Sequence, residues 1–230
     1  MKRSDLYFIV AVLIIFLPFA LIDPLYEWYK TFNAAHGMVM SFVKFALLST
    51  LGEMLGCRIS TGKYVTPVFG VLPRMVVWGF LGMGINMAMI IFSKGTPLFM
   101  EYMGFENAVQ SFNSLEFSMD KLWVSLAVSV AMNTIFAPVF MTFHKITDAH
   151  IAENGGSLKA LITPIPMARR FSELNWQAQW GFVFKKTIPF FWYPAHTITF
   201  LLPPEQRVLF AALLGIALGV LLAISIKKNK

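Results

Sequence analysis

Long apolar segments separated by short polar ones repeat along this 230-residue chain. A helix needs roughly 20 mainly apolar residues to cross about 30 Å of hydrocarbon. The pattern therefore predicts an all-α fold, a polytopic membrane helical bundle of about six transmembrane helices. The predicted spans are residues 6–22, 38–58, 74–93, 121–143, 182–202 and 207–226.

Composition supports a membrane protein. The chain is 57% hydrophobic and 13% charged, its mean hydropathy is +0.65, and a soluble domain would carry about twice that share of charge. No Pro-rich, Ser-rich or charged linker divides the sequence, so residues 1–230 are predicted to form a single membrane domain. The first expected partner is the lipid bilayer.

Basic residues gather on one side of the predicted spans. Of the 19 basic residues, 14 fall on the same side as the N-terminus, and only Lys30, Lys94 and Arg207 fall opposite. The positive-inside rule then places the N- and C-termini in the cytoplasm. A net charge of +7 also suits nucleic acid, but topology accounts for it, and we expect no nucleic-acid partner. The expected host is a bacterial inner membrane or an organellar membrane.

The first apolar segment allows two interpretations. Lys2 and Arg3 precede it, as in a secretory signal peptide. The sequence at residues 19–24 is a poor cleavage site, which favours an uncleaved first helix. Cys57 is the single cysteine, so no intrachain disulfide forms.

Small residues recur at helical spacing within the spans. Helices in lipid associate through close packing and polar contacts, and small residues let two backbones approach. We expect these glycines to serve packing within the bundle. In the last span, Ala211 and Ala223 extend the glycines into a stripe of small residues, and the alternative is that this stripe forms a homo-oligomer contact. The glycines are Gly52, Gly56, Gly79, Gly82, Gly215 and Gly219.

Three prolines interrupt the later spans. Pro138 lies in the fourth span, and Pro189 and Pro194 lie in the fifth. A proline inside a helix removes a backbone donor and clashes with the preceding turn, and membranes tolerate this only where protein or water satisfies the freed carbonyls. We expect kinks at all three positions, either as passive packing features or beside a polar interior.

A few polar residues fall inside the predicted spans. A charge at mid-bilayer costs roughly 2.5–3.5 kcal/mol on insertion scales, and such residues often serve function. Four of the residues are predicted to form one layer, with Glu53 nearer the cytoplasm, where it alternatively pairs with Arg58 or Arg74. The predicted pore-lining or substrate-binding residues are Lys44, Glu53, Asn86, Asn133, His196 and Thr199. The bland alternatives are that Lys44 snorkels outward and that His196 bonds a freed carbonyl.

Signals of catalysis are weak. The sequence has no zinc-protease, nucleophile-elbow or phosphate-loop motif. His144 and His150 are six residues apart in a predicted loop, which is not the spacing of a zinc pair on one helix face. We predict no enzyme, no catalytic residue, no metal and no cofactor; an intramembrane enzyme is the third and weakest alternative.

Several short motifs share their order with a known family. They are Gly52-Glu53, the glycines of residues 79–84, residues 133–138, and a C-terminal motif with Trp192, Phe200, Pro204 and Arg207. On these, residues 26–226 resemble the family of the twenty-two-kilodalton peroxisomal membrane protein, which also contains the mitochondrial inner-membrane protein whose loss depletes mitochondrial DNA. His196 and Thr199 replace the Gln and Asn of that family. The resemblance implies a small integral membrane protein. Some members of the family are held to conduct solutes, so the resemblance also suits a solute-conducting function.

Together, the polar layer and the doubly interrupted fifth span favour a pore or transporter for a small solute of unknown identity. The alternative is a non-transporting membrane scaffold or lipid-interacting protein, in which the polar groups only satisfy one another.

Overall fold

Helices form all the regular structure in residues 2–228, the part of the chain that the computed structural model describes. The elements follow one another with short connections. They are α1 (Arg3–Leu21), α2 (Asp23–Ala35), α3 (Gly37–Thr61), α4 (Val71–Tyr102), α5 (Ala108–Asn113), α6 (Met119–Glu153), the 3₁₀ helix η1 (Leu158–Leu161), α7 (Met167–Glu173), α8 (Trp176–Ala178), the π-helix η2 (Gln179–Trp192), α9 (Tyr193–Leu201) and α10 (Pro204–Lys228). The predicted all-α class is confirmed for the described residues.

Four of these helices are long and apolar enough to cross a membrane: α1, α3, α4 and α6. They match the first four predicted spans. The fifth predicted span is divided between η2 and α9, and the sixth falls in α10. The full count of six spans and the cytoplasmic location of both termini stay predictions.

The described chain consists of two compact units, Met1–Met40 and Ser41–Lys230. In the first unit the rings of Phe19 on α1 and Tyr29 on α2 meet edge to face at 5.8 Å. None of the residues of α1 is buried, as expected of a helix whose apolar side chains face lipid. The boundary between the units falls within α3, and the single domain stays a prediction.

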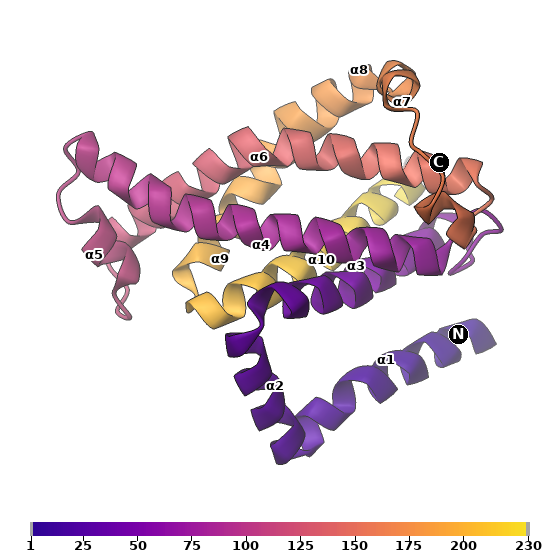
Figure 1. Cartoon of the computed structure of the whole chain (residues 1–230), viewed down its shortest axis with the longest axis horizontal. Coiled ribbons are helices and arrows are strands. Elements are labelled where there is room, and N and C mark those ends of the chain that lie inside the picture. The colour runs from indigo at the N-terminus through magenta and orange to yellow at the C-terminus, as the bar shows by residue number, and fades with distance from the viewer. Residues whose placement is uncertain (1, 229–230) are drawn as a thin grey trace. The chain divides into compact units, whose positions relative to one another are not determined.

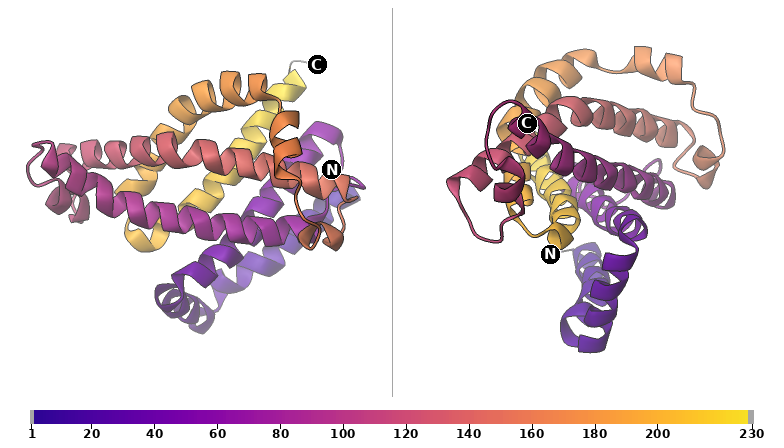
Figure 2. Two further views of the ribbon diagram at one scale, coloured as in Figure 1. Left: turned by 45° about the horizontal axis from the view of Figure 1, so that its top comes forward. Right: turned by 60° about the vertical axis from the view of Figure 1, so that its left-hand side comes forward.

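In the second unit α4 and α6 lie side by side (Figures 1 and 2). With 32 and 35 residues they measure about 48 and 52 Å at a rise of 1.5 Å per residue, well beyond the hydrocarbon thickness. The two helices therefore continue beyond the predicted span ends at residues 93 and 143. Each predicted span stops just before an ionisable residue, Lys94 or His144, whereas the helices continue through them.

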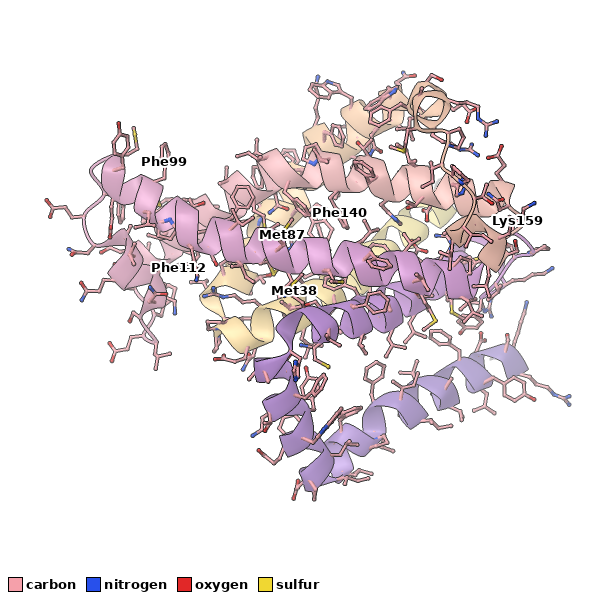
Figure 3. The ribbon with its side chains drawn as sticks, viewed as in Figure 1. Met38, Met87, Phe99, Phe112, Phe140 and Lys159 are labelled. Carbon is pink, nitrogen blue, oxygen red and sulfur yellow. The ribbon has the colours of Figure 1, made fainter. Side chains whose placement is uncertain are left out.

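The two ends of this unit differ in character. Phe99 and Phe112 lie at one end, and Lys159 lies at the other (Figure 3). The second end also holds the segment 62–70 and η1, since a Cβ on Gly70 would contact Gly156. We call it the basic end, because Lys63, Lys159 and Arg169 belong to its connecting segments.

Glycines set the approach of α3 to α4. A Cβ on Gly79 would overlap the ring of Phe42, and one on Gly82 would overlap Phe45. The aromatic rings of α3 therefore rest directly on the backbone of α4, and a larger residue at either glycine requires α3 to move.

The glycine stripe of α10 meets α3 of the same chain. A Cβ on Gly52 would lie 3.0 Å from the Cα of Ile216, and one on Gly219 would lie 3.6 Å from the carbonyl of Gly52. Gly56 and Gly215 lie in the same contact, near Gly219 and Ser49 respectively. This part of the stripe is thus engaged inside the chain, while the side chain of Ala223 lies outside those that the structure describes.

The fifth predicted span is a π-helix that passes into an α-helix. Pro189 lies inside η2, whereas Pro194 is the second residue of α9, where a missing N–H is tolerated. The Tyr193 N–H donates to the carbonyl of Ile188, five residues earlier. The expected kink at Pro194 is therefore a change of helix type. In α6 the helix continues through Pro138, whose carbonyl accepts from the Thr142 hydroxyl at 2.7 Å.

Candidate functional site

A buried ion pair joins α3 to α4 near the basic end. Arg74 Nη1 donates to Glu53 Oε2 at 2.5 Å, and Arg74 Nε donates to the carbonyl of Phe69 at 2.6 Å. Arg58, the other partner considered for Glu53, instead donates to the carbonyl of Gly62 at 3.2 Å. The acidic group of α3 is therefore held inside the bundle by a cation from the neighbouring helix.

Two residues of α6 complete this group. Arg74 Nη1 also donates to Asp148 Oδ1 at 2.5 Å. His144 Nε2 lies 3.3 Å from Glu53 Oε1 and 3.6 Å from Asp148 Oδ2. We call Glu53, Arg74, His144 and Asp148 the charged cluster; their side chains are only 12–22% exposed.

Aromatic rings enclose the charged cluster. The Arg74 guanidinium lies 4.7 Å from the centre of the Phe69 ring, and the His144 ring lies 4.5 Å from that of Trp78. His144 Nδ1 and Trp78 Nε1 are buried without a hydrogen-bond partner among the described residues. The first is an acceptor or donor and the second is a donor, so the site retains bonding capacity that its own side chains leave unused.

Two of the four residues of this site, His144 and Asp148, were not predicted as site residues. His144 and Asp148 were placed in a loop, although they occupy one face of α6 at i and i+4 spacing. That spacing was the signal available in the sequence, hidden by ending the fourth span at residue 143. His150 belongs to a different group, since its Nε2 lies 3.2 Å from the carbonyl of Ala160 at the end of α6.

The charged cluster contains metal-binding residue types. Glu53, His144 and Asp148 each offer one ligand atom, and these three atoms lie within 4.8 Å of one another. An imidazole combined with carboxylates suits several divalent ions. Arg74, however, bonds both carboxylates. It uses Glu53 Oε2 and Asp148 Oδ1, whereas His144 Nε2 faces Glu53 Oε1 and Asp148 Oδ2, so a metal ion beside His144 would share both carboxylates with the guanidinium.

A second, neutral polar group links α6 to α9. Asn133 Nδ2 donates to the carbonyl of Ser129 at 2.8 Å and lies 2.9 Å from His196 Nδ1. His196 Nδ1 also lies 3.1 Å from Asn133 Oδ1, so the ring nitrogen bonds the Asn133 amide as donor or as acceptor according to its tautomer. The Ser129 hydroxyl donates to the carbonyl of Tyr193 at 2.8 Å. The partner of His196 is therefore a side chain rather than a freed carbonyl.

The remaining predicted pore residues are also buried. Lys44 and Asn86 are 6% and 8% exposed, and each has an interaction partner. Their membership of one layer with Asn133 and His196 stays a prediction. Thr199 is fully buried, and its hydroxyl donates to the carbonyl of Ala195 at 3.0 Å, so in this conformation it is not offered to a solute.

A cavity of about 260 Å³ lies away from both polar groups. It is a partly open pocket lined by the last turns of α4 and by α5, with Lys94, Pro97 and Phe112 in its wall. None of the predicted pore-lining residues lines it, so it does not form part of the predicted path.

Comparison of the chain with protein-family models, with curated proteins and with solved structures found no match. The family resemblance therefore stays a prediction, and the functional argument rests on the geometry of the chain.

Proposed function

We propose that this chain is an integral membrane protein whose six helices carry a small polar solute across the bilayer, as a pore or transporter. The observation that carries the proposal is the charged cluster, in which three helices bury two carboxylates, a guanidinium and an imidazole. Ionisable residues inside membrane bundles are rare and typically mark solute or proton paths.

The arrangement of α6 supports a path rather than a single site. Asn133 and His144 are eleven residues apart, which is about three turns, so they lie on the same face about 16 Å apart along the axis. One face of α6 thus carries the neutral polar pair deep in the bundle and the charged cluster near its basic end. A solute that follows this face meets both.

Aromatic rings separate these two groups. Phe136 and Phe140 stack at 5.6 Å on α6, and Trp78 of α4 lies 6.2 Å from Phe140. Hydrophobic constrictions of this kind close channels by excluding water. We propose that the three rings form the closed gate of the path, and that opening requires Phe140 to move.

Flux through proteoliposomes tests the proposal. The purified chain is reconstituted, and uptake of small polar solutes by light scattering and ion current across planar bilayers are both recorded. We expect permeation above empty vesicles, a several-fold reduction in His144→Gln, and a larger leak in Phe140→Ala. Arg169→Gln is the matched control, because Arg169 lies at the same end but pairs at the surface, where its side chain is 50% exposed.

A specific observation favours the alternative of a non-transporting scaffold. Each carboxylate of the charged cluster already has a cationic partner, so both acidic charges are balanced without a ligand. Cysteines placed at residues 86 and 133 in a Cys57→Ala background separate the two functions. A path exposes them to a water-soluble thiol reagent, whereas equal flux from full and empty vesicles together with unreactive cysteines would establish the scaffold.

A further inference from the structure

The segment of residues 176–186, formed by α8 and the first half of η2, is exposed along almost its whole length. Trp176, Trp180 and Phe182 are 41%, 58% and 47% exposed, and Gln179 is the one buried residue of the segment. After Gln179, the next buried residues of η2 are Thr187 and Ile188. Three large aromatic side chains are thus presented outward at the start of this helix.

Two lysines stand at the end of the same segment. Lys185 and Lys186 are exposed, and Lys185 Nζ lies 5.8 Å from the centre of the Trp180 ring. Neither lysine bonds a carboxylate within the described part of the chain. They therefore form a cationic pair whose charge is available to an external anion.

The neighbouring arginines show the opposite arrangement. Arg169 and Arg170 of α7 both pair with Glu153 of α6 and with Glu173 of their own helix. Their charges are neutralised, and they fix α7 to the end of α6. Of these four basic residues, the two lysines are the ones whose charges no acidic partner balances within the described part of the chain, and Lys185 lies near the exposed Trp180 ring.

We infer that residues 176–186 form a binding site for the headgroups of anionic phospholipids in the leaflet at the basic end. Trp and Tyr rings settle at the level of the headgroups, and lysines reach outward along their apolar stems to place the ammonium there. Anionic lipids attract such lysines from within a Debye length. The occupant is the lipid headgroup, because the same segment offers rings to the acyl boundary and cations to the phosphate.

Quenching by brominated lipids tests this site in the full chain. The protein is reconstituted into nanodiscs that contain either brominated phosphatidylglycerol or brominated phosphatidylcholine at the same fraction. We expect stronger quenching by the anionic lipid, and we expect Trp176→Phe/Trp180→Phe to remove the difference. In Lys185→Gln/Lys186→Gln the preference for the anionic lipid falls by about fivefold or more.

Two controls keep the test decisive. Arg169→Gln should leave the preference unchanged, because its charge is already paired, and an unchanged melting temperature shows that each variant is folded. Equal quenching by the two lipids, or a preference that survives loss of both lysines, overturns the inference. The inference is also overturned if inorganic phosphate, but not chloride at equal ionic strength, fully displaces the anionic lipid from the segment. That result would indicate a site for free anions.

Discussion

The charged cluster and the Asn133–His196 pair are both built on one face of α6, through His144 and Asn133 respectively. They satisfy their polar atoms in different ways. The cluster balances carboxylates against Arg74, and its side chains retain 12–22% exposure. The pair is neutral, its residues are 1% and 7% exposed, and its bonds include a backbone carbonyl. Charge is placed toward the end of the bundle, and neutral amide and imidazole groups are placed deeper.

Solvation explains this difference. An ion loses its hydration on burial, and its partner compensates only with good geometry and additional hydrogen bonds. A neutral amide loses less and needs only one or two partners. The comparison therefore indicates that the carboxylates of the charged cluster are kept where a cationic partner and partial exposure offset their lost hydration, whereas the neutral pair tolerates deeper burial.

The largest effect is expected from Arg74→Ala. Removal of the guanidinium leaves two carboxylates buried without their shared cation, which should lower the free energy of unfolding by about 3 kcal/mol. Chemical unfolding in detergent micelles measures the change. Arg74→Lys keeps the charge but loses the geometry that bonds both carboxylates, so its free energy of unfolding should lie between those of Arg74→Ala and the parent chain. A smaller loss of stability in Arg74→Ala than in Arg169→Ala would contradict a buried role for Arg74.

A smaller effect is expected from Gly82→Ala, which tests the close packing of α3 on α4, the two helices that supply Glu53 and Arg74. A Cβ there overlaps Phe45, so overpacking should destabilise the bundle by roughly 1–3 kcal/mol. Gly84→Ala is the matched control in the same helix, because nothing lies within 4 Å of its added Cβ. Thermal melts of the two variants side by side check the prediction, which fails if they are equally stable.

Asn133→Leu should cost about 1–2 kcal/mol, since it leaves buried His196 without its side-chain partner. The double variant Asn133→Leu/His196→Phe should be less destabilised than the sum of the single variants, because the orphaned group is then removed. Unfolding free energies of the four proteins in one detergent provide the cycle. Additive losses would show that the two residues do not act as a pair.

The smallest effect is expected from Arg169→Ala, which breaks the half-exposed pairs at the end of α6. Exposed ion pairs contribute about 0–1 kcal/mol and are screened by salt. We therefore expect a small loss of stability that disappears at about 1 M salt, while the loss in Arg74→Ala persists. A salt titration of both variants distinguishes the exposed pairs from the buried cluster.

The polar residues show how far the sequence could be interpreted. Glu53 stood out because it is an acid within an apolar span, and Arg74 was one of its two suggested partners. His144 and Asp148 were missed because they follow the last apolar residues of the fourth span, where hydropathy no longer distinguishes helix from loop. Asn133 and His196 were both identified, but their contact joins residues 63 positions apart, which periodicity does not reveal.

The proline interpretation shows the same limit. Pro138, Pro189 and Pro194 were expected to act alike, because each removes one backbone donor. The structure separates them, with one inside a continuing α-helix, one inside a π-helix and one in the first turn of α9. Which carbonyls each proline leaves free depends on the helix type, and the Ser129 hydroxyl of α6 donates to one carbonyl next to Pro194, that of Tyr193.

By itself the sequence determined that the chain is helical and apolar, because a segment in hydrocarbon must satisfy its backbone within its own helix. It also marked the glycines and most of the buried polar residues, since each departs from an apolar background. Only the tertiary structure decided which of them meet. Contacts such as Arg74 with Asp148 depend on the rotation and length of helices that pack against each other, and these follow from side-chain fit between distant segments rather than from local pattern.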